Sequence, residues 1–158
     1  MTIEEIIELV SGRDGVLVLT PSEGDGRPEL SRGDAFFYYS PDGVVPTTVQ
    51  PFATVVTKNY PGDESSRLDR PDTFRVNIHA GKEEFTERLG RTPREAARTD
   101  VDPGVEDTLI AHPVYGTAGW LAIVNPASNT EAAVRELLDT AYRLDRARYE
   151  RRADSSRD

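Results

Sequence analysis

Polar and apolar residues alternate along residues 73–79, and this is the most regular short pattern in the chain. Successive side chains of a β-strand point to opposite sides of a sheet. The pattern therefore predicts a strand whose core-facing side carries Phe74, Val76 and Ile78. The opposite side of the same strand would carry a polar row formed by Arg75, Asn77 and His79.

Short apolar or aromatic runs between turn residues predict further strands. These runs are residues 15–20, 34–39, 52–57, 108–111 and 119–124. The first run is apolar from Val16 to Leu19, so we expect a central strand that is buried on both faces. The loop that follows is rich in glycine and proline, and we expect only a short strand in it, around Glu29 and Leu30.

Apolar residues at helical spacing predict a helix near each end of the chain. A capping-box pattern at Thr2 precedes a first helix that ends near Gly12. The same pattern at Ser128 precedes a last helix that reaches about Arg151. Two short surface helices are expected between them, at residues 81–89 and from Thr92. The polar residues 153–158 are expected to form a frayed tail.

The length and composition indicate one domain. The chain has 158 residues, 37% hydrophobic and 30% charged, and we assign residues 1–152 to a single α+β domain. No run approaches the roughly 20 apolar residues of a membrane-spanning helix, and the N-terminus lacks a signal-peptide pattern, so we expect a cytoplasmic protein with no membrane partner. The absence of cysteine excludes disulfides, thiolate nucleophiles and cysteine-ligated metals.

Three runs resemble a bacterial family of domains of unknown function that spans nearly the whole chain. They are GDAFFYY at 33–39, FRVNI at 74–78 and HPVYG at 112–116. The order of elements, with Pro113 and Tyr115 ahead of Trp120 and a closing helix that contains Leu137 and Leu138, more distantly resembles the MmcQ/YjbR-like domains. That resemblance implies a two-layer α+β fold: a mainly antiparallel sheet of about five to six strands, packed by N- and C-terminal helices. It also implies a DNA-binding role, while neither family supplies catalytic residues.

The polar row of the 73–79 strand would suit an anionic ligand if the helices leave that face open. Arginine offers a planar fork for carboxylate or phosphate, and histidine titrates near neutral pH. The candidate ligand-binding residues are Arg75, Asn77, His79, Asp34, Lys58, His112 and Tyr115. The ordinary alternatives are the solvated face of an antiparallel sheet for the row, a turn for His112, and packing for Tyr115.

The leading hypothesis is therefore non-catalytic binding of a small anionic molecule or of a protein partner. Exposed aromatic residues within the run 36–39 would favour a protein partner or a homodimer. An alternative hypothesis is an enzyme whose site combines His79, Arg75 and Asp34.

A second alternative is nucleic-acid binding through arginines near the end of the last predicted helix. They are Arg143, Arg146, Arg148, Arg151 and Arg152. The same residues would also complement the macrodipole at a helix C-terminus without any further role. The formal net charge of -9 repels polyanions, so we rank this alternative below the leading hypothesis and above the enzyme.

The sequence has no motif for a metal or a cofactor. His79 and His112 are its only histidines, and no closely spaced ligand pair joins them to a carboxylate such as Asp34 or Asp107. The P-loop, the GxGxxG fingerprint and the HExxH motif are all missing. We predict no metal site and no cofactor.

Overall fold

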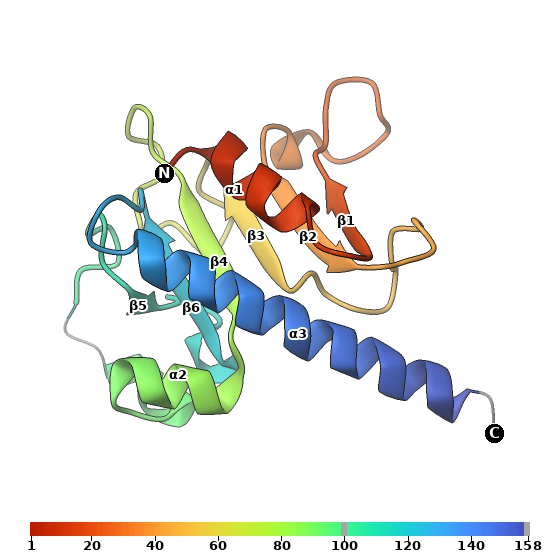
Figure 1. The fold of residues 1–158 in the computed structure, drawn as a ribbon. Coiled ribbons are helices and arrows are strands. Elements are labelled where there is room, and N and C mark those ends of the chain that lie inside the picture. Colours follow the sequence, from red (N-terminus) through yellow and green to blue (C-terminus); the bar gives the residue numbers. More distant parts are fainter. Residues whose placement is uncertain (99–100, 157–158) are drawn as a thin grey trace.

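The computed structural model describes residues 1–98 and 101–156 and shows an α+β fold (Figure 1). Within these residues, helices pack against one open antiparallel sheet of six strands. The strands are β1 (Val16–Leu19), β2 (Ala35–Tyr39), β3 (Ala53–Val56), β4 (Arg75–His79), β5 (Ile110–Ala111) and β6 (Trp120–Val124). The helices are α1 (Ile3–Ser11), α2 (Gly81–Leu89) and α3 (Glu131–Ser155), and short 3-10 helices lie at Glu29–Ser31, Pro93–Arg98 and Gly116–Ala118. The predicted fold class is confirmed.

The strands follow the order β1-β2-β3-β4-β6-β5, and each neighbouring pair is antiparallel. Directly opposed residues in paired strands point to the same side of a sheet, so the register creates cross-strand rows. On the helix side, one row joins Val55, Val76 and Ile123. On the other side, the adjacent row joins Phe36, Thr54, Asn77 and Ala122. The predicted alternation of β4 thus separates an apolar face from a polar one.

The helices α1 and α3 lie across the same face of the sheet (Figure 1). α1 begins at its N-cap Thr2, whose Oγ1 accepts the backbone N–H of Glu5 at 3.1 Å, as the capping-box pattern predicts. Ile6 and Val10 lie one helical turn apart, and both are fully buried together with Leu137 of α3. Burial of each such side chain contributes about 1.5 to 3 kcal/mol, so this face supplies the main hydrophobic core.

β1 lies at the edge of the sheet, and the prediction of a central strand is wrong. It pairs only with β2 in the described part of the chain, and all four of its residues are half-buried. Val16 and Val18 pack against the core under α1. On the other side, the cross-strand neighbours of Leu17 and Leu19 are large aromatic residues of β2, which shelter them in place of a second layer.

Two segments form 3-10 helices in place of the elements that we predicted. The residues around Glu29 form no strand, because both the N–H and the hydroxyl of Ser31 donate to the carbonyl of Pro28 in a local turn. The helix expected from Thr92 is likewise the 3-10 helix Pro93–Arg98.

α3 starts from a tertiary contact rather than from the predicted capping box at Ser128. Its N-cap is Thr130, whose side chain makes no capping hydrogen bond. Instead, the carboxylate of Asp107 accepts the backbone N–H groups of Ala127, Asn129 and Thr130. A carboxylate from a distant loop therefore organises the turn that leads into this helix.

The end of α3 also differs from the prediction. The helix continues past Arg151 to Ser155, and its last turns extend beyond the sheet (Figure 1). Residues 157 and 158 of the predicted frayed tail lie outside the described residues. α3 has 25 residues but is too polar to cross a bilayer, and no other helix in residues 1–98 and 101–156 is long and apolar enough either.

Candidate functional site

A loop covers the polar row of β4. The segment between β3 and β4, residues 57–74, crosses this face of the sheet and buries Leu68 against Val56; we call it the strap. Beneath it, Arg75 is only 1% exposed and Asn77 only 3% exposed. For these two residues the alternative of an ordinary solvated sheet face is therefore wrong.

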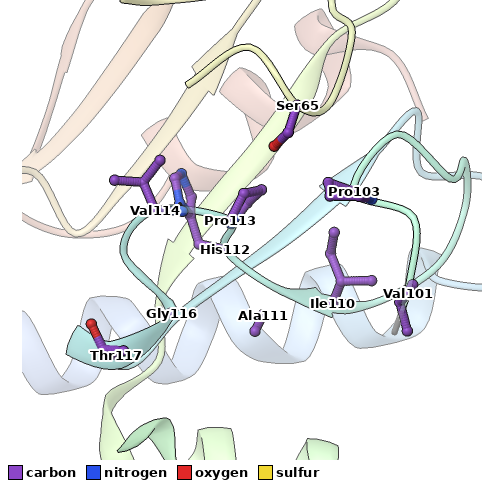
Figure 2. Close-up of a pocket in the computed structure, with 10 residues that line it drawn as sticks. All are labelled: Ser65, Val101, Pro103, Ile110, Ala111, His112, Pro113, Val114, Gly116 and Thr117. Carbon is purple, nitrogen blue, oxygen red and sulfur yellow. Dashed lines mark hydrogen bonds between the residues drawn. The ribbon is translucent and has the colours of Figure 1, made fainter. Parts of the chain in front are cut away.

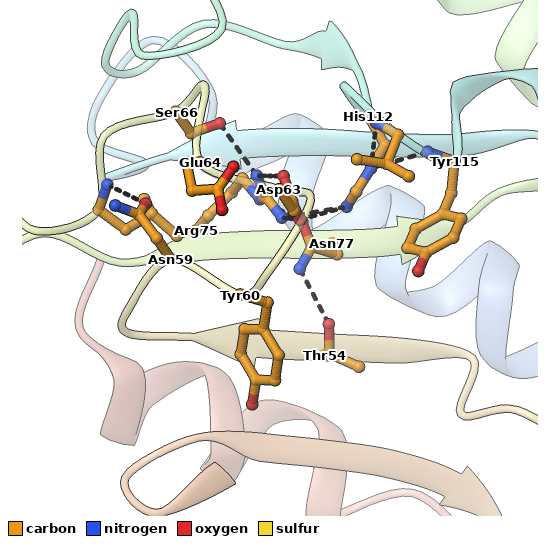
Figure 3. A network of polar contacts seen from close by, with 12 residues as sticks. Thr54, Asn59, Tyr60, Asp63, Glu64, Ser66, Arg75, Asn77, His112 and Tyr115 are labelled. Atoms are coloured by element: carbon orange, nitrogen blue, oxygen red, sulfur yellow. Dashed lines mark hydrogen bonds and ion pairs between the residues drawn. The ribbon is translucent and has the colours of Figure 1, made fainter. Parts of the chain in front are cut away.

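The guanidinium of Arg75 is the centre of a buried polar network (Figure 3). Its Nε donates to Asn77 Oδ1 at 2.7 Å, and its Nη1 donates to Ser66 Oγ at 3.0 Å. Nη1 and Nη2 together hold the carboxylate of Asp63 in a bidentate ion pair. The remaining N–H of Nη2 faces the ring of His112. Arg75 thus has no free fork to offer to an incoming anion.

The charges of Asp63 and Arg75 balance each other inside the protein. Burial raises the pKa of Asp63, but the hydrogen bonds and the charge of Arg75 outweigh burial and hold that pKa below its ordinary value. The two side chains are 13% and 2% exposed. Loss of either partner from a buried pair leaves an uncompensated charge, so the pair fixes the strap above β4.

His112 joins the network from the turn before β6. Its Nδ1 accepts the backbone N–H groups of Val114 and Tyr115, both at 3.0 Å, as expected for a histidine in a turn. Its Nε2 lies 3.1 Å from Arg75 Nη2 and 3.8 Å from Asp63 Oδ2. Burial and then the charge of Arg75 lower the pKa of His112 to about 3, so the ring is neutral at pH 7.

An open pocket of about 400 Å³ lies above this network, and we call it the sheet-face pocket. Its aromatic lining residues are Phe36, Tyr38, Tyr60, Tyr115 and Trp120. Its polar floor consists of Thr54, Asp63, Arg75, Asn77 and His112. Figure 3 shows Tyr60 and Tyr115 on either side of the hydrogen bond that Asn77 Nδ2 donates to Thr54 Oγ1. The pocket therefore combines apolar walls with a few oriented polar groups.

A second pocket, of about 320 Å³, shares His112 and Val114 with the first (Figure 2). Its other side chains are mainly apolar, among them Val101, Pro103 and Ile110. None of the described residues that line it is charged. It offers fewer polar groups for recognition than the sheet-face pocket.

Asp34 and Lys58 form a separate cluster, which Tyr60 connects to the sheet-face pocket. The buried carboxylate of Asp34 accepts from Lys58 Nζ at 2.9 Å and from the backbone N–H and the hydroxyl of Thr57. It also accepts a short hydrogen bond from the Tyr60 hydroxyl. Burial and this bond raise the pKa of Tyr60, so the phenol stays protonated. The cluster anchors the start of the strap to β2.

His79 lies apart from both clusters. Its ring stacks on Trp120, with centroids 5.2 Å apart and an interplanar angle of 11°. Burial and then the charge of Arg148 lower the pKa of His79. The three residues of the enzyme hypothesis therefore do not form one site. Arg75 forms an ion pair with Asp63, Asp34 forms one with Lys58, and His79 stacks on the indole of Trp120.

The family comparison covers almost the whole chain. A model described as a family of unknown function, DUF6194, matches residues 1–154. The chain belongs to the DUF6194 family. The predicted membership of a family of unknown function is confirmed. Searches among curated proteins and among solved structures give no match, and the resemblance to MmcQ/YjbR-like domains stays a prediction.

The five candidate arginines near the end of α3 in this DUF6194 chain divide into two sets. Arg143 pairs with Asp139, and Arg146 pairs with Glu150. The other three, Arg148, Arg151 and Arg152, line a shallow hollow at the C-terminal end of the helix. Within the part of the chain that the structure describes, this second set makes no ion pair, so its charge is available for an anionic partner.

The carboxylates and histidines of the described residues form no group that could hold a metal ion. Asp107, one of the two carboxylates considered from the sequence, instead accepts backbone N–H groups before α3. Asp34, the other carboxylate, accepts from three residues at the start of the strap, Thr57, Lys58 and Tyr60.

Four of the seven candidate ligand-binding residues line the sheet-face pocket, and their role in binding stays a prediction. They are Arg75, Asn77, His112 and Tyr115. Asp63 was missed, because a Pro-Gly-Asp turn in a polar loop has no pattern that distinguishes a buried ion pair. The sequence did not indicate that Phe36 and Thr54 lie side by side in the pocket, because the pairing of β2 with β3 places them together.

Proposed function

We propose that this chain binds a small organic molecule with a planar, apolar body in the sheet-face pocket. The observation that carries the proposal is an open, aromatic-lined pocket of about 400 Å³ above a buried polar floor. Ligand pockets in proteins are typically concave and mainly apolar, with a few well-placed polar groups. The volume lies within the range of about 300 to 1,000 Å³ that is usual for such sites.

The polar groups of the pocket floor are cross-linked to one another without any ligand. Four residues from three separate segments hold Arg75 by hydrogen bonds, ion pairing or close contact. Such cross-linking lowers the entropy that ligand binding has to remove, because the polar groups are already oriented. Trp120 and Tyr115 add flat walls that can stack on a planar ligand.

A protein partner has less support than a small molecule. Phe37, Tyr38 and Tyr39 are buried and Phe36 is half-buried, so β2 offers no stripe of exposed aromatic side chains for a partner or a second copy. The nucleic-acid alternative depends on Arg148, Arg151 and Arg152, which make no ion pair with the other described residues, in a chain of net charge -9. A concave pocket fits a small ligand better than either surface fits a macromolecule.

The chain contains its own probe for this proposal. Trp120 is the only tryptophan and lines the sheet-face pocket, so its fluorescence reports on occupancy. We would screen planar neutral and charged compounds by Trp120 fluorescence and thermal shift. A pocket-filling variant, Thr54→Met, should abolish a true signal, whereas Val44→Ala, at a 63% exposed position outside the pocket, should preserve it.

Four outcomes separate the proposal from its competitors. A compound that changes the fluorescence of the parent and of Val44→Ala, but not of a folded Thr54→Met, supports binding in the pocket. A signal of equal size in all three proteins places the compound elsewhere. No signal from any compound of this class contradicts the proposal, and DNA binding that fades with salt would favour the α3 arginines.

A further inference from the structure

The position of the proton on His112 follows from its neighbours. Nδ1 accepts two backbone N–H groups, from Val114 and Tyr115, and an accepting nitrogen carries no proton. The neutral ring therefore carries its proton on Nε2. The other tautomer would place an Nδ1–H against two backbone donors, a worse conflict than any on the Nε2 side.

This tautomer leaves the Nε2–H without an acceptor in the described protein. Its nearest polar neighbour is Arg75 Nη2 at 3.1 Å, and a guanidinium only donates. Asp63 Oδ2 is 3.8 Å away, beyond hydrogen-bond range, and already binds Arg75. A buried donor without a partner is unfavourable, so the site is incomplete by one acceptor.

The rest of the floor also has donors in excess. Asn77 Nδ2 has two N–H groups, and one of them donates to Thr54 Oγ1. Thr54 Oγ1 accepts that bond, and its own hydroxyl hydrogen donates to none of the described residues. The carboxylate oxygens of Asp63 each accept from Arg75 and do not reach these groups. A ligand that pairs with the remaining N–H of Asn77 and the hydroxyl of Thr54 has to supply oxygen acceptors.

The charge of the floor decides which kind of acceptor fits. Arg75 and Asp63 neutralise each other, and His112 is neutral. A ligand carboxylate would be buried beside Asp63 with no cation of its own, and that arrangement is strongly unfavourable. A carbonyl oxygen accepts the same hydrogen bonds and adds no charge.

We infer that the ligand of the sheet-face pocket is a neutral planar molecule whose carbonyl oxygen, from an amide, lactam or ketone, accepts from the polar floor, where Asn77 Nδ2 and His112 Nε2 each carry an N–H without an acceptor among the described residues. This inference rests on the proposed function and narrows it, since it replaces the anionic ligand expected from the sequence by a neutral one. Asp63 then acts as the residue that excludes carboxylates from the pocket.

A matched pair of probes tests this preference: 2-naphthamide and 2-naphthoate, which share shape and differ in charge. We expect the parent protein to bind the amide at least about tenfold more tightly than the carboxylate by calorimetry at pH 7.5. Asp63→Asn keeps the shape of the side chain and gives the floor a net positive charge. That variant should reverse the order, while Val44→Ala should keep the parent's order.

A second measurement uses only the parent protein, in case Asp63→Asn does not fold. Nitrogen-15 NMR of the imidazoles reports the tautomer directly, and we expect the proton of His112 on Nε2, with a resonance that moves when the amide binds. A proton on Nδ1, or a parent protein that binds the naphthoate as tightly as the amide, overturns the inference. If the naphthoate binds as tightly as the amide, the pocket still binds a planar ligand and the proposed function stands. If neither probe nor any screened compound binds, the inference and the proposed function are both overturned.

Discussion

The two faces of the sheet are built on different principles. On the helix side, α1 and α3 bury a continuous apolar core that includes Phe37, Ile123 and Leu137. On the strap side, a loop covers a network of polar and charged groups around Arg75 and leaves a pocket beside them. The same strand, β4, contributes to both faces through alternate residues.

This difference between the faces suggests that the helix side mainly stabilises the fold and the strap side mainly determines which ligand binds. Apolar contacts are numerous and non-directional, so the helix side holds the fold together through many small contributions. The polar contacts of the strap side are few and directional, and each one depends on its partner. A substitution on the helix side should therefore act mainly on folding, and one at the rim of the pocket mainly on binding.

The largest effect is expected on the helix side. Leu137→Ala removes a fully buried side chain of α3, and we expect a loss of about 3 kcal/mol in the free energy of unfolding, measured by denaturant titration. Leu144→Ala, the same substitution at a 37% exposed position of the same helix, should cost under about 1 kcal/mol. Equal losses at the two positions would contradict the assignment of the core to this face.

The next largest effect should come from the ion pair of the strap side. Asp63→Asn leaves Arg75 charged and buried, and we expect a loss of about 3 kcal/mol. Arg75→Met should cost less, about 1 to 2 kcal/mol, because the strap can turn the carboxylate of Asp63 towards water. Denaturant titration of both variants measures this asymmetry. A greater loss for Arg75→Met would show that the strap holds Asp63 in place without its partner.

The stability of the protein should also depend on pH, through His112 on the strap side. The pKa of His112 is about 3 in the folded chain and about 6.5 in the unfolded chain, so the unfolded state binds more protons between these values. Stability is then lost as the pH falls from 6.5 towards 5, with a slope that approaches about 1.4 kcal/mol per pH unit.

The variant His112→Gln should flatten this slope in urea titrations at several pH values. His79 also has a lowered pKa, so it adds to the dependence in the same direction, and His79→Gln serves as the matched comparison with a smaller effect. A parent protein whose stability does not change between pH 6.5 and 5 would show that His112 is not a buried neutral residue.

The helix side was largely predictable from the sequence. The spacing of Ile6 and Val10, and of the apolar stripe of α3, identifies both helices, because helix packing repeats at fixed intervals along the chain. β1 was misplaced, since four successive apolar residues look alike in a central strand and in an edge strand with aromatic neighbours. The start of α3 was misassigned because Asp107, about twenty residues away, organises it.

The strap side was predictable only in part. The alternation of β4 correctly identified Arg75 and Asn77 as polar residues on one face. Their burial depends on Asp63 and Ser66, which lie in a loop without periodicity, and loop geometry is decided by tertiary contacts that no local pattern encodes. The position of the proton on His112 Nε2 can be inferred only from the structure, because it depends on the backbone N–H groups of Val114 and Tyr115 in the turn.

The smallest effect on stability and a clear effect on binding are expected at the rim of the pocket. Tyr115 is 54% exposed, and only its backbone N–H contributes to the hydrogen bonds of His112, so Tyr115→Ala keeps the network and removes one aromatic wall. We expect the free energy of unfolding to change by less than about 0.5 kcal/mol. The affinity for 2-naphthamide should fall about three- to tenfold, the loss of one aromatic contact, as measured by calorimetry. Val44→Ala should change neither quantity. If Tyr115→Ala instead lowers stability by as much as Asp63→Asn, the rim is part of the folding core of the strap side, and binding and stability are not separable on this face.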